Sequence, residues 1–129
     1  MKFAKIVFYV AAVWGVLTLT PLYFMFDVIG RQDPPPITHP AFFYGFVGTA
    51  LAWQVGFFII ASDPVRFRPM MIPSVLEKIG YGAAVVVLFL EKRIRPGDLV
   101  FAGADLLLAV LFLISLLKTK SFDAVSTKL

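Results

Sequence analysis

Hydrophobic residues occur in four long runs along this chain, and polar residues are concentrated in the stretches between them. The runs cover residues 4–26, 41–61, 74–90 and 99–117. Each is close to the ~20 residues that an α-helix needs to cross the hydrocarbon core of a bilayer. The pattern therefore predicts four transmembrane helices.

The stretches between the runs are short, and this limits how the helices can be arranged. Short connections place consecutive helices side by side and antiparallel. We expect an all-α fold, an up-down-up-down bundle of four transmembrane helices, with residues 1–129 forming one integral membrane domain. The first run exceeds the ~7–15 apolar residues of a secretory signal peptide, so we expect it to be a retained helix.

Small residues recur every three or four positions along the second run, and they predict how that helix packs. They are Gly45, Gly48, Ala52 and Gly56. Such a stripe lets two helix backbones approach closely, which is how membrane helices associate. We expect this face to lie inside the bundle.

The third run begins with a pattern that is typical of a helix start. Ser74 and Glu77 have the spacing of a capping box. In a capping box, the side chain of each of the two residues accepts a hydrogen bond from the backbone amide of the other. This start places Lys78 near the membrane surface, where its ammonium would reach the head groups. We expect Glu77 to act as a cap. The alternative is a polar cluster of Glu77 with Arg66 and Arg68 that binds an anionic head group.

Composition agrees with a membrane protein. Hydrophobic residues make up 60% of the chain and charged residues 16%, whereas soluble domains average about 45–50% and 25%. The net charge of +4 comes from basic residues that flank the apolar runs. Basic residues in such places contact lipid head groups, so we expect membrane lipids and no nucleic acid as partners.

The distribution of basic residues predicts the orientation. Lysine and arginine are more frequent on the cytoplasmic side of membrane proteins. The side that carries Arg31, Lys92, Arg93 and Arg95 has four of them. The side that carries both termini has eight: Lys2, Lys5, Arg66, Arg68, Lys78, Lys118, Lys120 and Lys128. We therefore expect both termini in the cytoplasm.

Residue usage also excludes several kinds of chemistry. The chain has no cysteine, which excludes disulfides, iron–sulfur clusters and thiol catalysis. His39 is its one histidine, so a single chain cannot form an all-histidine metal site. Phosphate-binding, dinucleotide-binding, nucleophile-elbow and zinc motifs are absent from the sequence. We expect no metal and no cofactor. Whether the chain is an enzyme stays open, although a non-catalytic role is favoured.

Asp105 is the strongest candidate for a functional side chain. It lies six residues into the fourth run, roughly 9 Å from the predicted outer boundary. Charged residues at such depth are costly and often mark ion or proton pathways, so Asp105 would accept a proton or bind a cation. The alternative, which we favour from the sequence, is a structural carboxyl group. In that case Tyr44, which enters the second run at similar depth, would donate a hydrogen bond to it.

Two further polar residues are candidates. Gln54 lies within the second run, where an interhelical hydrogen bond is expected and a ligand contact is the alternative. His39 lies at the outer mouth, where we expect an exposed loop histidine. The alternatives for His39 are haem ligation and pH sensing.

Several short motifs resemble those of a known group of proteins. They are HPAFFYGF at 39–46, AWQ at 52–54, SDPVRFR at 62–68, LEK at 76–78 and ADL at 104–106. With these motifs the chain resembles small four-helix bacterial membrane proteins of uncharacterised function, similar to the DoxX-like and BphX-like families. The resemblance implies a bacterial inner (plasma) membrane protein. Some DoxX-like relatives are membrane subunits that work with quinone-linked oxidoreductases. No catalytic residues come with the resemblance.

Three functions compete on this evidence. The small-residue faces and the lack of catalytic motifs favour a non-catalytic subunit or partner of a membrane-associated system, which the resemblance suggests is quinone-linked. Its partner would be another membrane protein or a second copy of the chain. The second function is a small proton- or cation-coupled transporter that uses Asp105. The small multidrug transporters, which also have four helices, place their essential carboxylate in the first helix instead.

The third function is the binding or modification of a lipid or isoprenoid by Asp105, Glu77 or His39. Such a site normally gathers several polar side chains at one depth. The helix limits expected above place Asp105 and Glu77 near opposite faces of the membrane. This separation counts against a shared site.

Overall fold

The computed structural model describes residues 2–120, so Met1 and residues 121–129, with the Lys128 counted above, lie outside the described part. Four helical segments within it are long and apolar enough to cross a membrane: Lys2–Phe24, Pro40–Ser62, Arg68–Leu90 and Asp98–Lys118. The expected all-α fold with four membrane-spanning helices is thereby confirmed. The individual elements are α1 (Lys2–Leu19), η1 (Thr20–Phe24), α2 (Phe26–Gln32), α3 (Pro40–Ser62), η2 (Arg68–Met70), α4 (Met71–Leu90) and α5 (Asp98–Lys118).

The start of the third span differs from the expected capping box. Helix α4 begins at Met71, directly after the 3₁₀ turn η2. Ser74 therefore lies inside the helix, where its hydroxyl donates a 2.7 Å hydrogen bond to the carbonyl of Met70. Pro73 is tolerated there because the first turn of a helix leaves its amides without intrahelical partners. The predicted capping box is wrong, and the span starts earlier than expected.

The segment after the first span also differs from the expected loop. The α-helical part of that span ends at Leu19, and a 3₁₀ turn that contains Pro21 continues it to Phe24. Helix α2 follows at once and occupies the first part of the stretch between the first two apolar runs, where the pattern predicts a loop. A proline in a helix removes one hydrogen bond and clashes with the preceding turn, which accounts for the change of helix type.

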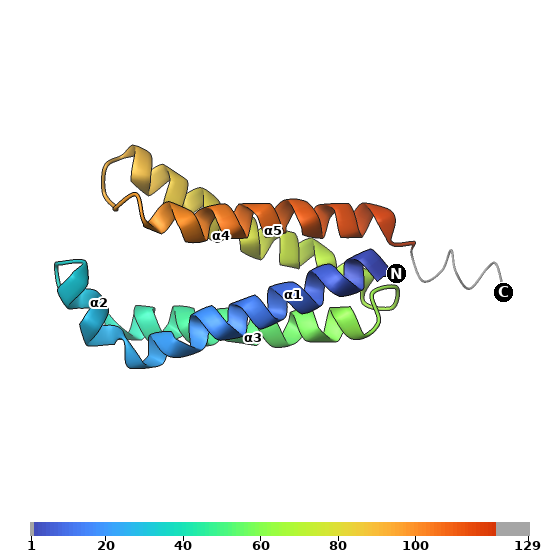
Figure 1. The fold of residues 1–129 in the computed structure, drawn as a ribbon, viewed down its shortest axis with the longest axis horizontal. Helices are drawn as coiled ribbons and strands as arrows, with labels where there is room; N and C mark the ends of the chain where they lie inside the picture. Colours follow the sequence, from blue (N-terminus) through green and yellow to red (C-terminus); the bar gives the residue numbers. More distant parts are fainter. Residues whose placement is uncertain (1, 121–129) are drawn as a thin grey trace.

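The helices are arranged as two antiparallel pairs, α1 with α3 and α4 with α5 (Figure 1). One end of the bundle carries the start of α1 and the end of α5, and we call it the terminal end. The other end carries α2 and the connection between α4 and α5, and we call it the loop end. The pairs are joined mainly by contacts between α1 and α5, whereas α3 touches α4 little.

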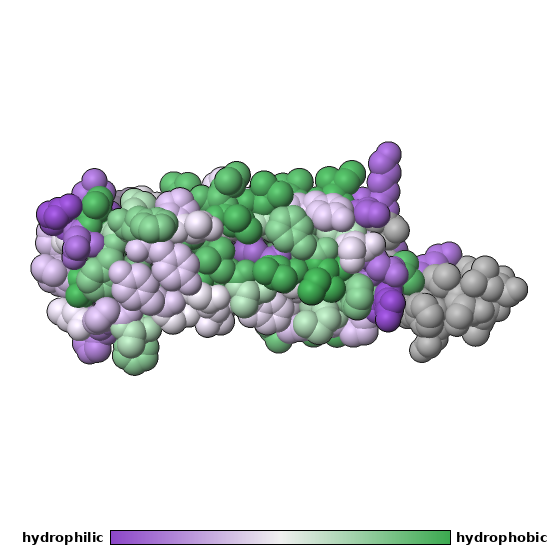
Figure 2. All heavy atoms as spheres, turned by 90° about the horizontal axis from the view of Figure 1, so that it is seen from below, coloured by the Kyte–Doolittle hydropathy of each residue, from purple (hydrophilic) through white to green (hydrophobic). Residues whose placement is uncertain are grey.

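The apolar core lies in the terminal half of the bundle. The rings of Phe8 and Phe112 are stacked with their centroids 4.2 Å apart, and the Phe57 ring meets the Phe112 ring edge-on at 5.0 Å. All three side chains are fully buried. We call these three residues the aromatic plug. On the face that Figure 2 shows, a mostly apolar band separates hydrophilic surfaces at the two ends.

Most of the small-residue stripe of α3 does not lie inside the bundle, and of its members Gly48 alone comes near another element, with the Tyr23 hydroxyl 3.4 Å from an added Cβ. A Cβ added to Gly45 would meet no atom within 4 Å, and Ala52 is exposed. The buried face of α3 is formed instead by Val47, Ala50, Gln54, Phe57, Ile60 and Ala61. The predicted packing face is therefore wrong. Helix α3 is apolar on nearly all sides, so hydrophobic periodicity could not show which side faces its neighbours.

Candidate functional site

A cavity of about 550 Å³ and a second of about 330 Å³ adjoin the contact between the two helix pairs. The smaller one, which we call the vestibule, is lined at the loop end by Asp33, Arg95 and Asp98. Its lining continues inward to Gln54 and to the charged side chains described next. A cavity of this size that combines apolar walls with a few polar groups is typical of a small-molecule site.

Three charged side chains meet at the inner part of the vestibule. The Nζ atom of Lys78 lies 3.4 Å from Oδ1 of Asp105 and 3.6 Å from Oε2 of Glu77. The Lys78 side chain is 5% exposed, and those of Glu77 and Asp105 are 19% and 16% exposed. We call these three residues the ion cluster. Its Lys78 ammonium lies 5.3 Å from the centroid of the Phe57 ring, so the aromatic plug is directly adjacent.

The helix positions explain why these groups meet. Lys78 is seven residues after the first residue of α4, and Asp105 is seven residues after the first residue of α5. At 1.5 Å per residue, Lys78 lies roughly 10 Å from the terminal end, where α4 begins, and Asp105 lies roughly 10 Å from the loop end, where α5 begins. The long lysine side chain covers the distance that remains between the two positions along the bundle. Gly82 brings the two helices together, because a Cβ there would lie 2.6 Å from Cγ of Leu106.

This arrangement corrects several expectations about the charged residues. Glu77 and Asp105 do not lie near opposite faces of the membrane, because both contact Lys78. Lys78 does not extend to the head groups either, since it is buried. A helix that starts at Ser74 places Lys78 only four residues from the membrane surface. Counting the apolar residues from Met70 to Ile72 as helix would have shown that it lies inside the membrane.

Tyr44 is not the partner of Asp105. Its ring stacks on that of Phe26, with centroids 5.5 Å apart, and on that of Tyr23 at 6.1 Å. These aromatic residues lie near the loop end of the α1–α3 pair. The expected hydrogen bond between Tyr44 and Asp105 is therefore absent, and Lys78 takes that place.

Gln54 is fully buried and lies against another helix without bonding to it. Its Nε2 atom donates a 2.7 Å hydrogen bond to the carbonyl of Ala50 in its own helix, where the sequence predicts an interhelical bond. Its Oε1 atom has no hydrogen-bond partner among the described residues. The side chain fills the space that a Cβ would need at Gly15 of α1. Gln54 thus lines the vestibule, with its Oε1 atom buried against Gly15.

The remaining candidates lie away from the ion cluster. Arg68 donates from Nε to the carbonyl of Thr119 at 2.7 Å and to that of Leu116 at 3.2 Å, so it binds the end of α5 rather than Glu77. The Arg66 guanidinium lies over the ring of Phe67, 5.5 Å from its centroid. His39 is exposed and shares a 2.8 Å hydrogen bond with Thr38. No cluster of Glu77 with the two arginines forms.

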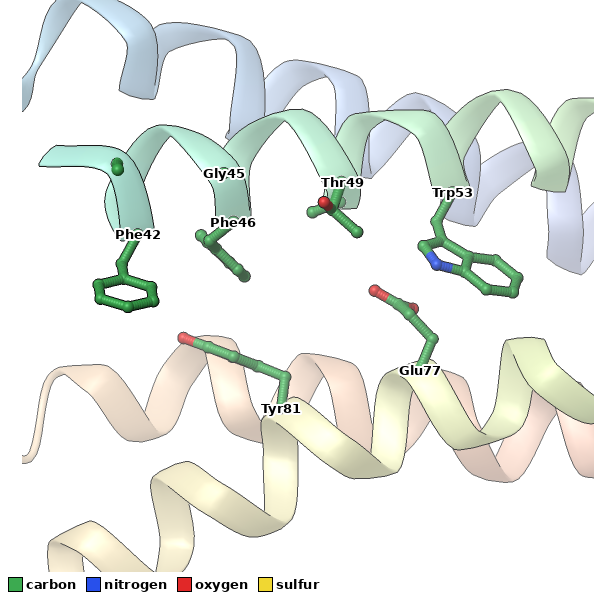
Figure 3. A pocket seen from close by; sticks show the side chains of 9 residues that line it. Phe42, Gly45, Phe46, Thr49, Trp53, Glu77 and Tyr81 are labelled. Atoms are coloured by element: carbon green, nitrogen blue, oxygen red, sulfur yellow. The ribbon is translucent and has the colours of Figure 1, made fainter.

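The larger cavity is a groove between α3 and α4, which we call the lateral groove. Figure 3 shows Trp53, Thr49 and Phe46 of α3 on one wall and Glu77 and Tyr81 of α4 on the other. The Glu77 carboxylate points from α4 towards the α3 wall (Figure 3). Four residues line both the groove and the vestibule, so the two spaces adjoin: Phe46, Ala50, Glu77 and Tyr81.

An ion pair links the two halves at the mouth of the vestibule. Nε of Arg95, in the connection between α4 and α5, lies 3.1 Å from Oδ1 of Asp33, which directly follows α2. The same guanidinium donates from Nη1 to the carbonyl of Gln32 at 3.3 Å. The Arg95 and Asp33 side chains are 59% and 38% exposed, so the pair contributes about 1 kcal/mol or less.

No protein-family model, curated protein or solved structure matches this chain. Within residues 2–120, no group of three or more histidine, cysteine, aspartate or glutamate side chains is placed to hold a metal ion. The functional argument therefore rests on the ion cluster, the vestibule and the lateral groove.

Proposed function

We propose that this chain is a small multi-pass membrane carrier that exchanges a cation for a proton at the ion cluster. The observation that carries the proposal is the charge of the cluster. Two carboxylates, Glu77 and Asp105, share the single ammonium of Lys78. With all three groups ionised the cluster has one excess negative charge, inside a span that is otherwise apolar.

An uncompensated charge at this depth is costly, because neither lipid nor apolar side chains solvate it. One proton on either carboxylate neutralises the cluster, and so does one bound monovalent cation. Holding both would leave an excess positive charge. The proton and the cation therefore exclude each other, and such mutual exclusion is the minimal requirement for coupled exchange.

The surrounding shape supports access from one side. The vestibule extends from the loop end to the ion cluster, and the buried aromatic plug closes the bundle beyond it. The helix pairs touch little between α3 and α4, so one pair could rock against the other about the α1–α5 contact and disrupt few other contacts. Rigid-body rocking of this kind is a known route to alternating access.

Location and orientation belong to this proposal. We infer a bacterial inner membrane from the motif resemblance and cytoplasmic termini from the basic residues. The vestibule would then open to the outside. The role of a partner subunit in a quinone-linked system stays a prediction from the sequence. The carrier role gains weight because the ion cluster gives Asp105 the charged partners that the sequence did not suggest.

Proteoliposomes that enclose a pH-sensitive dye test the proposal. Each of three cations, sodium, tetramethylammonium and tetraphenylphosphonium, would be supplied as an inward gradient. At least one of these gradients should drive proton efflux from the liposomes. Asp105→Asn should abolish that efflux while the protein stays folded, because the remaining Lys78–Glu77 pair is neutral without a proton. The matched control Asp27→Asn, an exposed aspartate of α2 that lines neither the vestibule nor the lateral groove, should retain it. Proton efflux from Asp105→Asn at the rate of the unmodified chain would refute the proposal.

A further inference from the structure

The lateral groove is a binding site with the features expected for one class of ligand. We propose that it admits lipophilic organic cations with aromatic substituents, taken up sideways from the bilayer, with Glu77 as the contacting carboxylate. This inference rests on the proposed function, because it names the substrate class of the same carrier. It is carried by three observations, namely the position of the groove, its lining and the charge at its base.

The groove lies where a membrane-dissolved molecule would reach it. Its rim includes Phe42, whose side chain is 79% exposed on the outside of α3. Gly45 also lines it and has no atom within 4 Å of an added Cβ, so this wall is open. Both residues lie in a membrane-spanning segment, where the exposed surface faces lipid. The groove can therefore be entered from the bilayer without passage through water.

The lining favours aromatic and cationic groups. Trp53, Phe46 and Tyr81 present rings along the groove, with Phe46 and Tyr81 stacked at a centroid distance of 6.0 Å (Figure 3). Ring faces attract cations, and the attraction grows when water is excluded. The size of the groove, about 550 Å³, lies in the range of sites for drug-sized molecules.

The charge at the base of the groove selects the sign of the ligand. Oε2 of Glu77 is buried and has no hydrogen-bond partner among the described residues. Its ion-pair partner Lys78 lies 3.6 Å away and is also held by Asp105, the third charged group of the cluster. Tyr81, one turn further along α4, supplies a hydroxyl but no charge. The Glu77 side chain is 19% exposed and lines the groove, so a cation there would lie beside the excess negative charge of the cluster.

Binding to protein in phosphatidylcholine nanodiscs tests the inference. Tetraphenylphosphonium and tetraphenylborate have nearly the same shape and opposite charge, and equilibrium dialysis against empty nanodiscs corrects for partition into lipid. We expect the phosphonium to bind to the protein and the borate not to bind. Glu77→Gln should raise the Kd of the phosphonium about tenfold or more, since a charge contact is lost. The exposed Glu91→Gln, at the end of the same helix, is the matched control and should leave the Kd unchanged.

A second pair of variants tests the groove without touching the ion cluster. Gly45→Phe should fill the groove and weaken binding of the phosphonium, whereas Gly103→Phe, at an equally open glycine of α5, should not. Equal binding of both ions, or an unchanged Kd in Glu77→Gln and Gly45→Phe, would overturn the inference. Proton exchange with sodium but no binding of the phosphonium would overturn this inference alone. Phosphonium binding at Glu77 without proton exchange by any cation would instead overturn the proposed function.

Discussion

Replacing Lys78 by methionine tests whether its ammonium compensates the charge of the two carboxylates inside the bundle. Methionine keeps much of the length and apolar character of the lysine stem but removes the ammonium. The two carboxylates that Lys78 contacts at 3.4 and 3.6 Å would then be left without a cation. By contrast, Glu77→Gln or Asp105→Asn leaves one carboxylate with the ammonium, which is a neutral pair.

The magnitude follows from the contact distances and the burial. At an effective dielectric constant of about 20, each pair near 3.5 Å contributes about 5 kcal/mol of Coulomb energy. The desolvation of the charges offsets much of this, and removing one partner of a buried pair costs about 3–5 kcal/mol. The carboxylates are 16% and 19% exposed, so some hydration remains. We therefore expect a cost near the lower limit, about 3 kcal/mol.

Thermal unfolding in detergent, followed by the fluorescence of Trp14 and Trp53, measures the cost. For a chain of this size about 3 kcal/mol corresponds to a fall in Tm of roughly 10 °C. Lys5→Met, an exposed lysine of α1, is the matched control and should shift Tm little. The triple variant Glu77→Gln, Lys78→Met and Asp105→Asn should recover most of the loss, because it leaves no charge. A Lys78→Met variant as stable as Lys5→Met would refute the reasoning.

Two further predictions concern packing and access. Gly82→Leu should destabilise the protein by about 1–3 kcal/mol through overpacking against Leu106, whereas Gly80→Leu, at an open glycine of the same helix, should not. Equal shifts of the two variants in thermal unfolding would contradict the α4–α5 contact. The native chain has no cysteine, so single cysteines report access cleanly. Thr18 lines the vestibule, so Thr18→Cys should react with a membrane-impermeant thiol reagent faster than Leu17→Cys, its outward-facing neighbour. Equal rates would contradict access to the vestibule from the aqueous side.

Hydropathy was sufficient to predict the four spans, because a bilayer demands about 20 apolar residues for each helix. It was not sufficient to predict which faces meet. Helix α3 is apolar nearly all round, so its small residues suggested a packing face although Gly45 points to open space. Side-chain packing decides this, and α3 uses Val47 and Phe57 on another face.

The candidate site was only partly predictable for a similar reason. Asp105 could be singled out because a carboxylate within an apolar run is costly wherever its partner lies. Lys78 was missed as its partner because the pattern at Ser74 suggested a later helix start than the one at Met71. A shift of three residues moves a side chain roughly 4.5 Å along a helix, which separates a surface lysine from a buried one.

The most direct test of the central claim is to count the protons released when a cation binds. Purified protein in weakly buffered detergent would be titrated with tetraphenylphosphonium while a pH indicator and the bound ligand are measured together. Mutual exclusion at the ion cluster predicts about one proton released for each cation bound at saturation, and none from Asp105→Asn. Saturable binding of the cation with no proton release from the unmodified chain would contradict the account.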